Sequence, residues 1–222
     1  MTVRLYIAHS KRALSMALAF GWLPAARYTN LRDVKSFDRL GFLDIDWANY
    51  DFARHLAAAR ATRPALTVAR DIEQREQLPI ILEQAHILAE YADSVIVVPK
   101  DPALAPDMAQ LIPDCFLLGY SVPTKYGTTT LPPESFKRPV HLLGGRPDLQ
   151  RRLANLMPVV SLDCNRFTLD ATYGDFFDGE TFRPHPLGGY DNCLKDSLAN
   201  ITALWQDYIG PVVGSRSMEV RQ

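Results

Sequence analysis

The sequence has few cysteines, little net charge and no long apolar segment. Its three cysteines are widely spaced and form no Cys-x-x-Cys pair, which argues against a disulfide scaffold and against a cysteine-rich zinc site. A membrane helix needs about 18 or more consecutive apolar residues, and the apolar runs here are much shorter. The first run is also too short for a signal peptide. We therefore expect a cytoplasmic protein with no membrane partner.

Several motifs of cofactor and metal chemistry are also missing. The chain has no P-loop, no dinucleotide-binding GxGxxG fingerprint and no GxSxG nucleophile elbow. Its histidines lack the paired spacing of metal ligands; they are His9, His55, His86, His141 and His185. We expect neither a catalytic metal nor a cofactor. The formal net charge of −1 gives no overall attraction to nucleic acid, so such a partner would need a local basic patch.

The chain does contain a regular series of short apolar runs. They cover residues 4–8, 23–28, 42–46, 65–70, 94–98, 115–120, 140–144 and 159–163. Runs such as SVIVV at 94–98 are continuously apolar, which favours strands buried on both faces of a parallel sheet. Between the runs, apolar residues recur every three or four positions and predict helices over 11–20, 50–61, 72–91, 105–112 and 148–156.

This alternation predicts an α/β protein. Eight strand units favour a compact (β/α)8 TIM-type barrel, with a doubly wound parallel sheet as the alternative. Residues 122–139 read as one long loop, and 165–191 show no clear periodicity. A helix over 194–208 would close the barrel. We expect a single barrel domain over residues 1–210 and a C-terminal tail over 211–222.

The carboxyl ends of the predicted strands carry aspartates. In a parallel barrel these ends meet on one face, where catalytic groups lie. Asp44 and Asp46, Asp71 and Asp163 come from three different strands, and neighbouring carboxylates separate each other's pKa values. Such a cluster suits a reaction in which one aspartate attacks and another moves a proton. Asp44 and Asp46 lie on the same side of an extended strand, and we favour Asp46 because it is nearer the strand end.

Each of these features also has a structural interpretation. An aspartate after a strand is often a turn residue or a helix cap. Gly144 ends the seventh run and Gly145 follows it. These two glycines let the backbone approach a substrate closely, but they also suit a tight turn.

Residues 140–166, VHLLGGRPDLQRRLANLMPVVSLDCNR, resemble a known family. They are similar to the last two strand units of the tRNA-guanine transglycosylase (queuine tRNA-ribosyltransferase) superfamily, where an "LMGVG" strand, a short helix and a strand ending "FDC" precede an arginine. The resemblance extends over about residues 3–210. FLDIDWANYDF (42–52) corresponds to a strand ending in Asp followed by SGGF, LTVARD (66–71) to a strand ending in a base-binding Asp, and FLLGY (116–120) to a strand that contacts the base.

The resemblance implies a role for each matched residue. Asp163 would be the nucleophile that attacks C1′ of the nucleoside, expels guanine and forms a covalent glycosyl-enzyme. Asp46 would be the general acid/base, and Asp71 would accept hydrogen bonds from the base. The other implied base contacts are Gly119, Tyr120 and Ser121, with Trp47 or Tyr50 stacking on the base plane. Either aromatic side chain suits packing equally well.

The chain departs from the tRNA-acting pattern at three places. Residues 47–50 replace SGGF, SVPTKYG (121–127) replaces a glycine-rich loop, and the zinc-binding cysteine cluster is absent. The chain is therefore most similar to the zinc-free, DNA-modifying 7-deazaguanine transglycosylase branch of phages and bacteria. The implied partners are DNA and a free 7-deazaguanine base such as preQ0. If a phage encodes the protein, its location would be the host cytoplasm.

Attack on a duplex requires a flipped nucleotide and a basic rim. The predicted phosphate contacts are Arg146, Arg151, Arg152 and Arg166, with Lys125 on the long loop. Because the net charge is near zero, we also expect a partner subunit or a homodimer. Two alternatives stay open: an N-glycosidic hydrolase that uses the same aspartates with water, and a non-catalytic barrel that binds nucleic acid or a partner protein.

Overall fold

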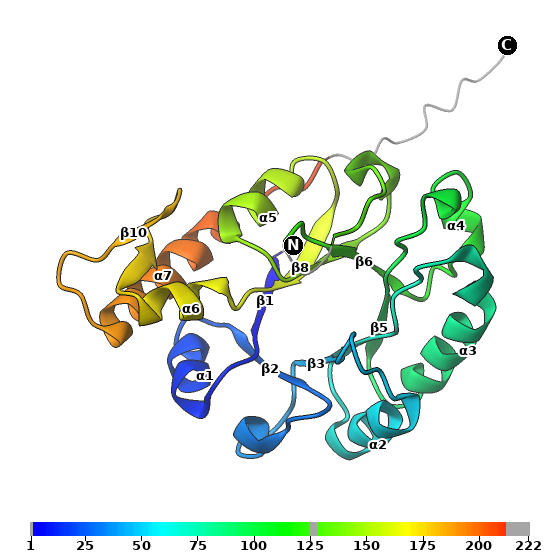
Figure 1. Cartoon of the computed structure of the whole chain (residues 1–222), viewed down its shortest axis with the longest axis horizontal. Helices are drawn as coiled ribbons and strands as arrows, with labels where there is room; N and C mark the ends of the chain where they lie inside the picture. Colours follow the sequence, from blue (N-terminus) through cyan, green and yellow to red (C-terminus); the bar gives the residue numbers. More distant parts are fainter. Residues whose placement is uncertain (1, 125–127, 212–222) are drawn as a thin grey trace, which may run out of the picture.

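Eight parallel strands close into a barrel in the order β1 to β8, with β8 paired to β1 (Figure 1). The computed structural model of the chain describes residues 2–124 and 128–211. The strands are β1 (Arg4–Ile7), β2 (Leu23–Arg27), β3 (Phe42–Asp44), β4 (Leu66–Val68), β5 (Ser94–Val97), β6 (Leu117–Ser121), β7 (Val140–Leu143) and β8 (Val159–Asp163). Each lies within or almost within one of the eight apolar runs. The predicted (β/α)8 barrel is confirmed, and the alternative of an open doubly wound sheet is wrong.

Helices follow most of the strands and surround the barrel (Figure 1). They are α1 (Lys11–Leu18), α2 (Phe52–Thr62), α3 (Leu78–Ala89), α4 (Met108–Leu111) and α5 (Pro147–Leu153). After β2 and β6, the described residues form short 3-10 turns, η1 (Arg32–Val34) and η4 (Pro133–Ser135), where a regular unit has a helix. Two more, η2 (Arg75–Gln77) and η3 (Pro102–Leu104), precede α3 and α4. Within the described ranges, no helix has the length and apolar character needed to cross a membrane.

The helix predicted over 72–91 is shorter in the structure. It begins at Leu78, because the backbone of Ile72 still pairs with the strand beside it. The Ile72 N–H donates to the Val98 carbonyl at 2.9 Å, and the Lys100 N–H donates to the Ile72 carbonyl at 3.0 Å. Pro79 suits the first turn of α3, where its missing N–H costs nothing. This extension of the sheet fixes the backbone on either side of Asp71 and Lys100.

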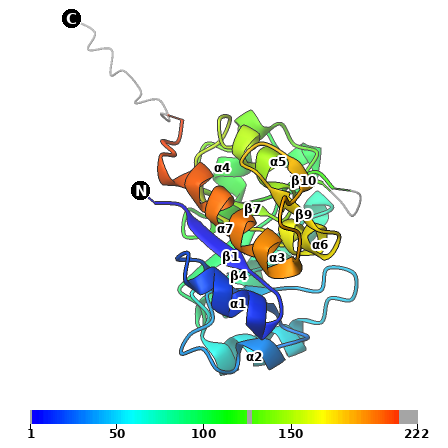
Figure 2. The same cartoon turned by 90° about the vertical axis from the view of Figure 1, so that its left-hand side faces the viewer.

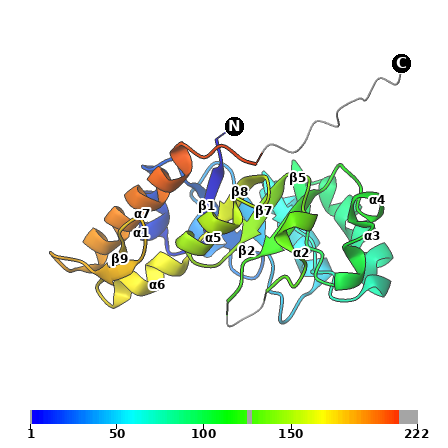
Figure 3. The same cartoon turned by 90° about the horizontal axis from the view of Figure 1, so that it is seen from above.

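Residues 165–191, which show no clear periodicity in sequence, contain regular structure. They form α6 (Arg166–Thr172) and an antiparallel hairpin of β9 (Asp175–Phe177) and β10 (Phe182–Pro184), and α7 (Tyr190–Gln206) follows. Together these elements lie on one side of the barrel, opposite α3 and α4 (Figures 1 and 3). The hairpin is tied to α7, because the Phe177 N–H donates to Ser197 Oγ at 2.9 Å. Apart from residue 211, the predicted tail lies outside the described residues.

The helix predicted over 194–208 is α7, which packs on the outside of the barrel, while pairing of β8 with β1 closes the barrel itself. Helix α7 lies beside α1 (Figure 2), and Arg12 of α1 forms an ion pair with Asp191 of α7. The buried side chain of Trp22 contacts both α6 and α7. Its indole N–H donates to Thr202 Oγ1 of α7 at 2.8 Å, and its ring packs edge-on against Phe167 of α6, with the ring centroids 5.5 Å apart.

Aromatic side chains fill the middle of the barrel. Tyr6, Phe42 and His141 are at most 1% exposed, and their ring centroids lie 5.1–5.9 Å apart. Two of them lie one layer below a strand end: Phe42 lies two residues before Asp44 on β3, and His141 two residues before Leu143 on β7. This packed layer closes the barrel from below and leaves a cavity above it.

Candidate active site

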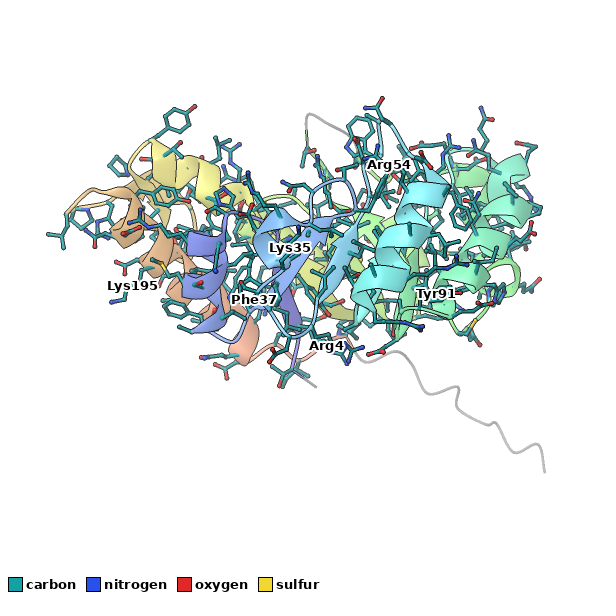
Figure 4. All side chains as sticks on the ribbon, turned by 90° about the horizontal axis from the view of Figure 1, so that it is seen from below. Arg4, Lys35, Phe37, Arg54, Tyr91 and Lys195 are labelled. Atoms are coloured by element: carbon teal, nitrogen blue, oxygen red, sulfur yellow. The ribbon has the colours of Figure 1, made fainter. Side chains whose placement is uncertain are left out.

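A pocket of about 260 Å³ lies at the carboxyl ends of the barrel strands. In Figure 4, Arg54 in the first turn of α2 lies toward this end of the barrel and Arg4 at the start of β1 lies at the other. The charged and amide side chains that line the pocket come from β2, β3, β8 and the segments that follow β4, β5 and β8; they are Arg27, Asp44, Asp71, Lys100, Asp163 and Asn165. The fold thus brings together one aspartate from each of the three predicted strand ends.

The first of these carboxylates, Asp163, is held by the turn after β7. It ends β8, is 8% exposed, and accepts the backbone N–H of Gly144 on Oδ1 at 2.9 Å. Its main-chain carbonyl accepts Gln150 Nε2 at 2.8 Å, and the same amide group donates to the Gly144 carbonyl at 2.7 Å. Gln150 therefore ties the turn after β7 to the end of β8, which fixes Asp163 relative to its N–H donor.

The turn that supplies this donor requires glycine. Gly144 and Gly145 have φ of +60° and +91°, in the left-handed region that side chains disfavour. A Cβ at Gly145 would also lie 2.3 Å from Cγ1 of Val122. Both glycines line the pocket, where sequence reasoning placed them. The two glycines therefore form a tight turn and also leave the backbone open to the pocket, so the two interpretations from the sequence are compatible.

The second aspartate of the pocket, Asp44, has a raised pKa. It ends β3, accepts the Ile45 N–H on Oδ1 at 2.8 Å, and its Oδ2 lies 3.9 Å from Arg27 Nε. Burial, and then the negative charge of Asp163, raise the pKa of Asp44 to about 7. Near neutral pH this carboxyl group is therefore about half protonated, as a general acid/base requires.

Asp46 does not line the pocket. The sequence argument that favoured it assumed that the strand continues to residue 46. In the structure β3 ends at Asp44, and Asp46 lies half-buried beyond Ile45. The alternation of an extended strand stops at this point, so the two aspartates have separate environments.

Asp71 and Lys100 form an ion pair in the wall of the pocket. Lys100 Nζ lies 2.5 Å from Asp71 Oδ2 and 3.3 Å from Glu73 Oε1. Burial raises the pKa of Asp71, and Lys100 opposes this effect. Burial alone would lower the pKa of Lys100, but Asp71 and Glu73 outweigh it and raise that pKa. The wall thus presents a carboxylate acceptor beside an ammonium donor.

Among the charged and amide side chains of the pocket, three received no functional role from the sequence, namely Arg27, Lys100 and Asn165. Their only sequence signal is a position at or directly after the end of an apolar run. Asn165 has a structural task, because its Oδ1 accepts the Ala8 N–H at 2.9 Å and joins the ends of β8 and β1.

The predicted base contacts divide into two groups. Ser121 and Trp47 line the pocket, and the Trp47 side chain is 58% exposed at its rim. Gly119, Tyr120 and Tyr50 do not line it. A Cβ on Gly119 would lie 2.6 Å from Ile96 Cγ2, and Tyr120 packs edge-on against Phe136 at 5.2 Å. The Tyr50 hydroxyl lies 3.2 Å from His55 Nδ1, outside the pocket.

The predicted phosphate-binding arginines lie outside the pocket and have nearby partners. These pairs are Arg146 and Arg152 with Asp148 at 2.9 and 3.2 Å, Arg166 with Asp170 at 2.7 Å, and Arg151 with Asn155 at 2.8 Å. The arginine side chains of the three ion pairs are 44–67% exposed, whereas Asp148 and Asp170 are 17% and 9% exposed, so the arginine ends of these pairs face solvent. Lys125 lies outside the described residues. In the described part of the chain, no group of three His, Cys, Asp or Glu side chains is placed to hold a metal ion.

Fold and pocket together define a class: a (β/α)8 barrel with three aspartates in a pocket at the carboxyl ends of its strands. The chain belongs to the family described as "Family of unknown function (DUF6610)", which matches residues 17–206. This match covers β2 to α7 and therefore includes Asp44, Asp71 and Asp163. A search of the curated proteins finds no match to the chain.

Proposed function

We propose that the protein is a glycosyltransferase that exchanges a purine base on a nucleoside through a covalent intermediate on Asp163. One observation carries this proposal: Asp44 and Asp163 share a pocket but are held differently. Asp163 accepts the Gly144 N–H on Oδ1, whereas burial and then the Asp163 charge raise the pKa of Asp44 to about 7. Two carboxyl groups whose environments separate their pKa values can act as a nucleophile and as a general acid/base.

The two residues divide the reaction into two steps. In the first step, a carboxylate oxygen of Asp163 attacks C1′, the C1′–N bond breaks, and the departing base takes the proton of Asp44. In the second step, the Asp44 carboxylate removes a proton from the incoming base, whose nitrogen attacks C1′ and releases Asp163. The sequence favoured Asp46 for this proton transfer, and the position of Asp44 in the pocket moves the proposed role to Asp44.

The pocket wall suits the edge of guanine. Guanine presents N–H donors beside the O6 acceptor, so Asp71 would accept from the donors and Lys100 would donate to O6. A cavity of about 150 Å³ holds benzene, and a pocket of about 260 Å³ therefore has room for a bicyclic base. Trp47 at the rim offers a ring on which the base or its neighbour can stack.

We further propose that the substrate guanine lies in DNA and that a 7-deazaguanine such as preQ0 replaces it. The similarity of residues 140–166 to the transglycosylases supports this assignment, as does the absence of their zinc-binding cysteines. The nucleotide would be flipped into the pocket, with Arg27 close to its sugar and phosphate. A partner subunit or a second copy would supply further phosphate contacts, because the chain carries a formal net charge of only −1.

The test is incubation of DNA with the protein and preQ0, followed by mass spectrometry of the nucleosides. We expect a modified nucleoside from the wild-type protein and from Asp46→Asn, which serves as the matched control, and none from Asp163→Asn. Release of guanine without incorporation would instead indicate a hydrolase. DNA binding with neither product, with partner proteins present, would indicate a non-catalytic barrel.

A further inference from the structure

A buried histidine lies directly beneath Asp163 inside the barrel. His141 on β7 pairs in register with Ser161 on β8, and Asp163 lies two residues further along β8. The imidazole is fully buried between the rings of Tyr6 and Phe42, with centroids at 5.9 and 5.1 Å. Each imidazole nitrogen lies near a different side chain of β8: Nδ1 lies 2.8 Å from Ser161 Oγ, and Nε2 lies 3.5 Å from Asp163 Oδ1.

The surroundings of the ring select one tautomer. Among the residues that the structure describes, Nε2 has no hydrogen-bond partner, although it is buried. A neutral imidazole carries its hydrogen on one nitrogen, and the Ser161 hydroxyl can either donate to Nδ1 or accept from it. With the hydrogen on Nδ1, the Nε2 lone pair would face a carboxylate oxygen, which is repulsive. With the hydrogen on Nε2, Ser161 donates to Nδ1 and an N–H points at Asp163.

We propose that His141 is a positioning residue that holds Oδ1 of Asp163, so that Oδ2 is the oxygen that attacks C1′. The Gly144 N–H and His141 Nε2 both approach Oδ1. This role rests on the proposed function of Asp163 as nucleophile. At 3.5 Å the contact is longer than a good hydrogen bond, and such contacts often tighten when the substrate binds. When the ester on Asp163 breaks, the same N–H stabilises the carboxylate that is released.

Two substitutions at His141 distinguish the effect of its N–H donor from the effect of its ring packing. His141→Phe keeps a ring against Tyr6 and Phe42 but has no N–H, whereas His141→Gln keeps a donor of similar reach. We expect His141→Phe to lower kcat for base exchange by about tenfold or more, as loss of a hydrogen bond to a charged group does, with KM for the incoming base unchanged. His141→Gln should recover most of that loss. Equal activity of His141→Phe and wild type would overturn the proposal.

A second measurement needs neither activity nor a core substitution. Long-range ¹H–¹⁵N NMR on the wild-type protein reports which imidazole nitrogen carries the hydrogen. We expect the Nε2–H tautomer in the wild type, and a loss of that preference in Asp163→Ala, which has no side-chain oxygen to face Nε2. A wild-type Nδ1–H tautomer would overturn the positioning role even if base exchange occurs. Absence of exchange in a protein with the Nε2–H tautomer would instead overturn the proposed function.

Discussion

The carboxyl groups of Asp44 and Asp163 end two strands of one barrel and share a pocket in which the charge of Asp163 helps to raise the pKa of Asp44. β3 and β8 are not neighbours in the sheet, so the closed barrel is what brings the two residues together. In the mechanism that we propose, Asp163 attacks and Asp44 exchanges the proton.

Base release should depend on the protonated form of Asp44. With a pKa of about 7, Asp44 loses its proton as the pH rises through neutrality, so the single-turnover rate of base release should fall between about pH 6 and pH 8.5, on the order of tenfold per unit at the upper end. Asp44→Asn should slow release by about 100-fold or more and remove this pH dependence. Rapid-quench measurement of released guanine tests both points. An unchanged pH profile in Asp44→Asn would assign the titration to another group.

The same pKa predicts a pH-dependent gain in stability from Asp44→Asn. The pKa of Asp44 is raised in the folded state, so its contribution to stability is fully present below about pH 4 and is lost as the pH rises through about 7. Asparagine avoids this loss and keeps an oxygen for the Ile45 N–H. We expect Asp44→Asn to unfold with a free energy about 1–2 kcal/mol larger than wild type at about pH 8, and about equal near pH 4.5. Urea denaturation at the two pH values measures the difference, and a gain of equal size at both would contradict the assignment.

The fold was predictable because its signal is local and repeated. Each buried parallel strand is a short apolar run, and SVIVV or VVSLD identifies its strand without knowledge of the neighbours. α6 and the β9–β10 hairpin were not predicted, since residues 165–191 carry many Asp, Gly, Pro and aromatic residues without a clear period. Their stability comes from tertiary contacts such as Phe177 with Ser197.

The site was predictable only in part. Asp71 and Asp163 could be placed at one face because all parallel strands end there. The choice between Asp44 and Asp46 depends on where β3 ends, and a two-residue shift of a strand end is beyond what apolar patterning resolves. The Lys100–Asp71 pair and the His141–Asp163 contact join different strands, so only the three-dimensional arrangement reveals them.

The two glycines of the β7 turn should differ in their tolerance of alanine. Gly144 has a positive φ but open space where an added Cβ would lie, so Gly144→Ala should cost about 1–2 kcal/mol of unfolding free energy. Gly145 combines a positive φ with a Cβ position 2.3 Å from Val122, so Gly145→Ala should cost about 2–4 kcal/mol. Chemical denaturation of both variants measures the difference. Equal losses would show that backbone strain, rather than the contact with Val122, sets the requirement for glycine.

The Asp71–Lys100 pair should decide which base the pocket accepts. Asp71→Asn replaces an acceptor by a group that also donates, and Lys100→Met removes the donor to O6 while keeping much of the side chain's length. Each change should weaken guanine binding by about tenfold or more, because a polar group on the edge of the bound guanine is then buried without a hydrogen-bond partner. Glu73→Gln is the matched control, since Glu73 also contacts Lys100 but its side chain is 58% exposed and does not line the pocket. Calorimetric titration with guanine and adenine measures the effect, and a wild-type protein that binds the two bases equally would remove this pair from the proposed recognition of guanine.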